Sequence, residues 1–114
     1  DSHNLIVIGA SEEDMALAAN RIRALGGGMV VVKDGEVIAQ MPLPYAGLMT
    51  GEPAEQAAAE NALVRDSVHA LAGRELFMTM SFISLPVIPH LKLTTLGLVD
   101  VDRQIRVPLL MKEE

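Results

Sequence analysis

The stretch Met-Val-Val-Val-Lys-Asp-Gly-Glu-Val-Ile-Ala-Gln, residues 29–40, decides the fold because it predicts a β-hairpin. Residues 29–33 and 36–40 are two strand-like runs rich in β-branched side chains. Asp34-Gly35 between them is a dipeptide that two-residue hairpin turns favour. A β-hairpin over residues 29–40 is therefore the central element of the expected fold.

A helix is expected on the N-terminal side of the hairpin. Ser11 offers an N-cap oxygen, and residues 12–14 are acidic, which suits the positive end of a helix dipole. Apolar side chains then recur at helical spacing, at Met15, Ala18, Ala19, Ile22 and Leu25. The glycine run at residues 26–28 marks the end of this helix.

A loop and a second helix are expected after the hairpin. Residues 42–49 contain two prolines and a glycine but are largely apolar, which predicts a packed loop. Pro53 suits a first helical turn, and the alanine-rich segment from Ala54 to about Ala72 predicts a long helix. Its expected buried face consists of Ala57, Ala58, Val64, Val68 and Leu71.

The C-terminal third gives a weaker pattern. Residues 77–85 alternate like a strand but also fit a short buried helix, and both interpretations stay open. Residues 93–101 predict a turn and short strand around Gly97, and residues 105–111 predict an edge strand that tolerates Pro108.

The fold class follows from the order of these elements. Residues 5–8 form a continuous apolar run that is typical of a central strand buried on both faces. Together with the hairpin and the two long helices, this predicts a single α/β domain over residues 1–114. We expect a mixed β-sheet sandwich with two main helices packed on the sheet.

Composition excludes several classes of function. The 114 residues are half hydrophobic and carry 9 basic against 15 acidic side chains, a net charge of -6, so neither nucleic acid nor an anionic membrane is expected as a partner. There is no cysteine, no apolar run long enough to span a bilayer and no signal peptide, so we expect a cytoplasmic protein. Because the chain begins with Asp1 and turns apolar at Leu5, we expect a piece of a longer polypeptide.

The residues that could carry chemistry do not form a complete set. His3, His69 and His90 lack the paired spacing of metal ligands, so no metal or other cofactor is expected within this chain. Residues 26–28 follow a helix rather than precede one, which is the wrong order for a phosphate-binding loop. Residues 9–11 are better explained by ordinary helix capping.

Two segments remain as candidates for contact with an active site. Asp1, Ser2 and His3 are adjacent in sequence, which argues against a catalytic triad, but they precede the first apolar run and can border a neighbouring pocket. Residues 77–89 interleave hydroxyl groups with Phe and Met, which suits core packing, burial against another domain or the lining of an apolar purine pocket.

Several blocks in order resemble the C-terminal domain of the adenine deaminases of the amidohydrolase superfamily. The blocks cover nearly the whole chain: residues 1–9, 26–35, 43–49, 77–82, 85–89, 91–94 and 97–101. The alanine-rich helix between them is generic. Arg74-Glu75-Leu76 departs from the Asp-Pro that the family carries before Phe77, which affects a local turn only.

The resemblance implies a function for the parent protein. It implies hydrolytic deamination of adenine to hypoxanthine and ammonia, with a metal-bound hydroxide attacking the purine C6. In this superfamily the metal ligands lie on a β/α barrel that this chain does not contain, so none of its residues takes over a ligand role. Manganese or iron is therefore expected in the full-length enzyme and not in this chain.

Two hypotheses for this chain follow. In the first, the domain supports the barrel of the same polypeptide, lies at the edge of its pocket or forms a contact within a homo-oligomer, and is inactive alone. In the second, the chain is a stand-alone, non-catalytic α/β module for ligand binding or oligomerisation.

Overall fold

The computed structural model describes residues 4–110, which separate into two compact units. Residues 5–76 form one unit, with α1 (Glu12–Leu25), β1 (Gly28–Lys33), β2 (Glu36–Pro42) and α2 (Ala54–Ala72). The other unit contains Asn4 and residues 77–110, with α3 (Phe77–Ile83), β3 (Leu91–Thr94), β4 (Gly97–Asp100) and β5 (Ile105–Arg106). Each unit is described by itself.

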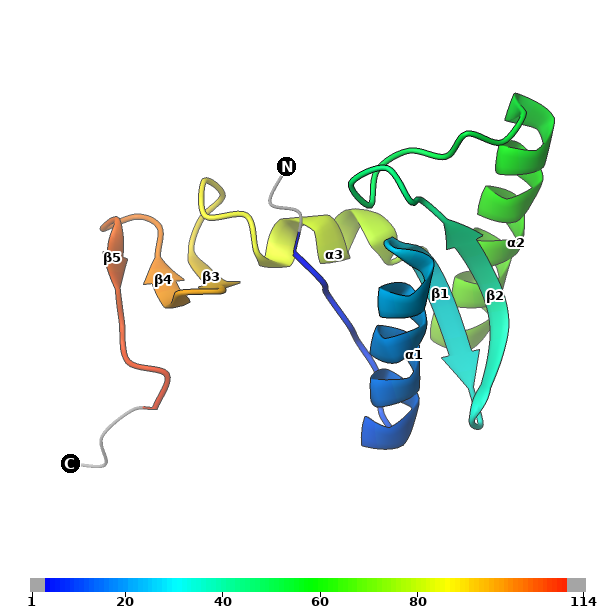
Figure 1. Ribbon diagram of the computed structural model, residues 1–114. Coiled ribbons are helices and arrows are strands. Elements are labelled where there is room, and N and C mark those ends of the chain that lie inside the picture. The colour runs from blue at the N-terminus through cyan, green and yellow to red at the C-terminus, as the bar shows by residue number, and fades with distance from the viewer. Residues whose placement is uncertain (1–3, 111–114) are drawn as a thin grey trace. The chain divides into compact units, whose positions relative to one another are not determined.

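The first unit is the predicted hairpin with one helix beside each strand. Strands β1 and β2 pair antiparallel, α1 packs against β1, and α2 packs mainly against β2, so the hairpin lies between the two helices (Figure 1). Asp34 and Gly35 both have positive φ, 51° and 81°, which is the geometry of a type I′ turn. The hairpin and both helices are therefore confirmed.

The core of this unit is small and aliphatic. Val31 lies opposite Ala39, and Met29 lies opposite Met41, so these four side chains share one face of the hairpin. A register shift after Val31 leaves Ile38 as the extra residue of a β-bulge, because Val32 already pairs with Val37. Val64 of α2 is fully buried, and the other buried apolar residues are Val31, Ala39 and Met41.

The start of α1 is fixed by two side chains. Ser11 is the N-cap: its Oγ accepts a hydrogen bond from the Asp14 N–H at 3.2 Å and donates one to the Glu13 carboxylate at 2.9 Å. Asp14 in turn accepts hydrogen bonds from the backbone N–H groups of Asp34 and Gly35, at 3.1 and 2.9 Å. The first turn of the helix is thereby joined to the turn of the hairpin.

The glycine run after α1 does more than stop the helix. Gly26 is the C-cap, in the left-handed conformation. Gly27, with φ of 133°, lies so close to the following loop that a Cβ atom there would sit 2.6 Å from the Gly47 Cα. The Gly27 carbonyl also accepts a hydrogen bond from the Leu43 N–H at 3.0 Å. The glycines that end α1 therefore also contact the loop after β2 and help to hold it in place.

The second unit begins with a helix and continues as a three-stranded meander. Residues 77–83 form α3, which settles the open choice for this segment in favour of a short helix. Strands β3, β4 and β5 pair antiparallel in that order, and a tight turn at residues 95–96 joins Thr94 to Gly97. The short strand predicted around Gly97 is confirmed.

Three details of the predicted sheet are wrong. Residues 5–8 form no strand, and Leu5 and Ile8 are exposed, because an apolar run predicts burial but does not supply a pairing partner. The α/β class is confirmed, but both sheets are antiparallel rather than mixed. The predicted edge strand at residues 105–111 is shortened to Ile105–Arg106, since Pro108 lacks the N–H that a longer ladder requires, and residue 111 lies outside the described residues.

Candidate functional site

The predicted pocket-edge residues Asp1, Ser2 and His3 lie outside the described residues, so their role stays a prediction. The described chain begins at Asn4, which is half-buried, and continues into the unpaired apolar run of residues 5–8.

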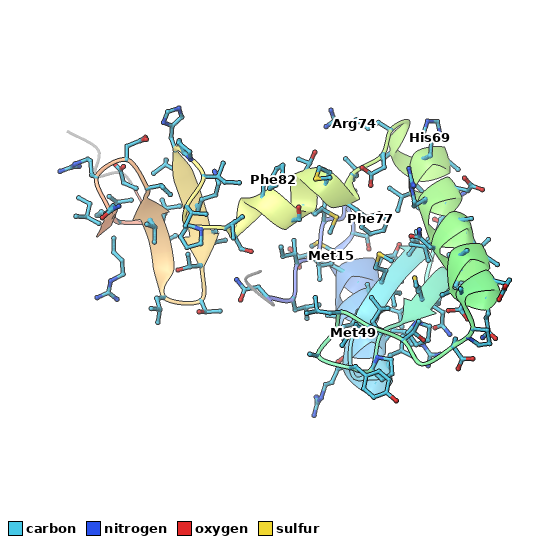
Figure 2. The ribbon with its side chains drawn as sticks, turned by 90° about the horizontal axis from the view of Figure 1, so that it is seen from above. Met15, Met49, His69, Arg74, Phe77 and Phe82 are labelled. Atoms are coloured by element: carbon cyan, nitrogen blue, oxygen red, sulfur yellow. The ribbon has the colours of Figure 1, made fainter. Side chains whose placement is uncertain are left out.

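The other two histidines are far from forming a metal site. His69 is exposed near the C-terminal end of α2 (Figure 2). His90 is exposed, and its Nδ1 is hydrogen-bonded to the Asp102 carboxylate, which ties the start of β3 to the turn after β4. Over residues 4–110 no group of three or more His, Cys, Asp or Glu side chains could hold a metal ion.

The segment of residues 77–89 exposes much of its apolar surface. Met78 and Phe82, four residues apart on α3, and Val87 are exposed, whereas Ser84 is buried. Figure 2 shows Phe82 on α3. Ser81 donates its hydroxyl hydrogen to the Met78 carbonyl, so this hydroxyl is engaged within the helix. Whether the segment lines a purine pocket stays a prediction.

A hollow with a volume of about 440 Å³ lies between the loop after β2 and the first turns of α2. We call this hollow the loop–helix pocket; it is lined by Pro42, Pro44, Tyr45, Thr50, Gly51, Glu52, Gln56 and Glu60. Its size falls within the range of small-molecule sites, but it is open and shallow because Tyr45 is 58% exposed. Two acidic side chains and no basic one line it.

The floor of this pocket holds a carboxylate in an unusual position. Glu60 Oε1 accepts a hydrogen bond from the Gln56 side-chain amide at 3.1 Å, one helical turn earlier. The second oxygen, Oε2, is buried and has no hydrogen-bond partner within the described residues. A buried carboxylate oxygen without a donor is costly, so this is the most unusual polar group of the first unit.

The sequence analysis missed this pocket. Glu60 sits in a generic alanine-rich helix, where an isolated glutamate is normally solvated. The only available signal was the i,i+4 spacing of Gln56 and Glu60, which predicts a helix-surface contact rather than a pocket. The pocket is formed by residues of the loop after β2 together with Gln56 and Glu60 of α2, so it depends on the tertiary arrangement of these two segments.

Among residues 4–110, no helix is both long and apolar enough to cross a lipid bilayer. The described residues contain helices, antiparallel strands, an acidic pocket and many exposed apolar side chains. The helices and strands of the described residues place the chain in the α/β class.

Comparison with known proteins gives the family. Residues 1–105 match the family described as adenine deaminase C-terminal domain, and the chain belongs to that family. An adenine deaminase of Brucella anthropi is 52% identical over 105 residues, covering 90% of this chain and 19% of the relative. One from Moorella thermoacetica is 52% identical over 102 residues, covering 88% of this chain and 17% of the relative. Adenine deaminase 1 of Agrobacterium fabrum is 50% identical over 112 residues, 90% of this chain and 18% of the relative.

The chain thus spans about one fifth of the length of the curated relatives that it matches. The resemblance noted in the sequence is confirmed as family membership.

Proposed function

We propose that the full-length protein catalyses the hydrolytic deamination of adenine and that this domain supports its catalytic barrel. In that reaction water adds to the purine C6 and the bond from C6 to the exocyclic nitrogen breaks. The products are hypoxanthine and ammonia. The observation that carries the proposal is the family match over residues 1–105 together with the names of the full-length relatives. We expect the enzyme to act in the cytoplasm and to form a homo-oligomer.

We place the metal outside this chain. Manganese or iron is the metal that the family resemblance implies, but residues 4–110 offer no cluster of three or more suitable side chains, so they do not fit such a site. We propose that the residues that hold the metal lie in the four fifths of a relative's length that this chain does not match. We propose that the domain alone is inactive.

The test is an assay of the full-length enzyme and of this chain with adenine, following hypoxanthine by chromatography and ammonia release. We expect turnover by the full-length enzyme only, lost on chelation and restored by Mn²⁺ or Fe²⁺. Turnover by this chain alone contradicts the assignment of the chemistry to the barrel. A full-length protein with no activity on adenine supports the alternative, a non-catalytic module for ligand binding or oligomerisation.

A second assay tests whether the N-terminal segment borders the pocket. We expect His3→Ala in the full-length enzyme to reduce kcat or raise KM for adenine more than His69→Ala does. His69 is a suitable control because it is exposed on α2 and is not one of the candidate pocket-edge residues. Equal, negligible effects of the two substitutions would remove residues 1–3 from the pocket edge.

A further inference from the structure

The loop after β2 presents apolar side chains in one defined conformation. We call residues 43–52 the Tyr45 loop; Tyr45, Leu48 and Met49 on it are 58%, 55% and 62% exposed. Figure 2 shows Met49 on this loop, beyond the end of the hairpin. Three large apolar side chains exposed within five residues form a patch rather than an isolated exposed residue, and such patches mark interaction sites.

The Tyr45 loop is held by its own backbone. The Tyr45 carbonyl accepts hydrogen bonds from the N–H groups of Leu48 and Met49, at 3.0 and 3.2 Å, and the Tyr45 N–H donates to the Met49 carbonyl at 3.2 Å. Ala46 and Gly47 take positive φ to close this turn. The patch therefore needs little ordering when a partner binds, which favours affinity.

The loop–helix pocket, which shares Tyr45 with the patch, favours binding of a positively charged group. Its lining includes Glu52 and Glu60 but no Lys or Arg, and Glu60 Oε2 is buried without a donor in the described residues. A guanidinium or ammonium group that enters the pocket would supply the missing hydrogen bond and balance the charge. The Tyr45 ring at the pocket rim offers a face on which such a cation can lie.

We propose that the Tyr45 loop and the loop–helix pocket form the docking surface for the remainder of the same polypeptide. That part presents an apolar patch to Leu48 and Met49 and inserts one Arg or Lys side chain toward Glu60. The length of the relatives is the reason for choosing this partner, because about four fifths of it lies outside the region that this chain matches. The acidic pocket calls for a basic side chain from the partner, and the exposed apolar loop calls for an apolar surface. This inference rests on the proposed function, since it takes the chain as one domain of a larger enzyme.

The first test is photo-crosslinking in the full-length enzyme, with p-benzoylphenylalanine placed at Met49. Leu71, also an exposed apolar residue but at the far end of α2 from the pocket, is the matched control position. We expect mass spectrometry to find position 49 joined to peptides from the region N-terminal to this domain, with a basic residue in or next to the joined segment, and position 71 not joined to them.

Three other results overturn the proposal. These are crosslinks from position 49 only to this chain's own residues, crosslinks only to a second subunit in a mixture of isotope-labelled and unlabelled enzyme, and equal yields from positions 49 and 71. Because activity on adenine is measured on the same samples, an active enzyme with any of these crosslinking results refutes the docking surface without refuting the proposed function.

The second test uses the sign of a stability change. If a basic side chain pairs with Glu60, Glu60→Gln removes a charge-assisted interaction and lowers the Tm of the full-length enzyme by at least about 2 °C. If nothing pairs with it, removal of an unpaired buried charge leaves Tm unchanged or raises it. Asp66→Asn, which changes an exposed acidic residue in the middle of the same helix and outside the lining of the loop–helix pocket, is the control and should leave Tm within about 0.5 °C. An unchanged or higher Tm for Glu60→Gln overturns the cation contact.

Discussion

Asp14 joins the first turn of α1 to the turn of the hairpin, and we expect Asp14→Ala to destabilise the first unit specifically at that junction. Its carboxylate accepts two backbone hydrogen bonds, from Asp34 and Gly35. These contacts are exposed, so each contributes about 0.5–1 kcal/mol. Loss of the negative charge at the helix N-terminus costs about 0.3–0.5 kcal/mol more. Alanine regains about 0.5 kcal/mol through its higher helix propensity.

The expected net loss for Asp14→Ala is therefore about 1–2 kcal/mol in the free energy of unfolding. Glu12→Ala is the matched control, because Glu12 lies in the same first turn and is exposed, so it tests the dipole and propensity effects alone. For that variant we expect a change below about 0.3 kcal/mol.

The assay is urea denaturation followed by far-UV circular dichroism, with amide hydrogen exchange as the local measurement. In Asp14→Ala the N–H groups of Asp34 and Gly35 should exchange faster, whereas in Glu12→Ala they should not. If the two variants lose the same stability and leave both amides equally protected, the carboxylate does not join helix to turn, and the reasoning fails.

Three further substitutions test the packing and the helix cap. Gly28→Ala should cost more than about 2 kcal/mol in unfolding free energy, because φ is 140° and a Cβ there would run into the Met41 carbonyl oxygen; urea denaturation measures it. Val64→Ala should cost about 2–3 kcal/mol in the same assay, because two fully buried methyl groups are lost. The pKa of Glu13 is lowered below 4.5, first by the backbone N–H of Glu13 itself and then by the Ser11 hydroxyl. Ser11→Ala should therefore raise that pKa part of the way back in an NMR titration. Because the folded-state pKa is the lower one, the stabilisation by Glu13 is present above about pH 4.5 and is lost as pH falls through the folded value, and this acid loss should shrink in Ser11→Ala.

The first unit was predictable because its signals are local. Asp34-Gly35 requires positive φ at both positions, which favours a hairpin wherever strand-like runs flank it. Ser11 and Gly26 cap α1 with interactions that span at most four residues along the chain. Such features need no knowledge of the tertiary structure, and all of them are present.

The errors came from features that depend on distant partners. The apolar run at residues 5–8 predicts burial, but whether it pairs as a strand depends on a neighbouring strand, and the described residues provide none for it. The expected buried face of α2 was correct at Val64, which is fully buried, and wrong at Ala58 and Leu71, which are exposed. Helical periodicity therefore identified the face but not how far the hairpin covers it.

The candidate site was the least predictable part for the same reason. The loop at residues 42–49 was expected to be packed because it is apolar, yet Tyr45, Leu48 and Met49 are exposed. The loop is apolar, as its sequence indicates. The prediction that it is packed assumed that residues of this chain cover it, and the exposed side chains show that the described residues do not.

An apolar loop that is held rigid yet uncovered, beside a buried carboxylate oxygen that lacks a donor, is costly for an isolated domain. Both costs disappear if one partner covers the loop and brings a cation to Glu60. A small domain with so few fully buried side chains gains the most from such a contact, because its own core contributes little stability. The same two features therefore explain why the domain should depend on the rest of the enzyme and where that dependence should be measured.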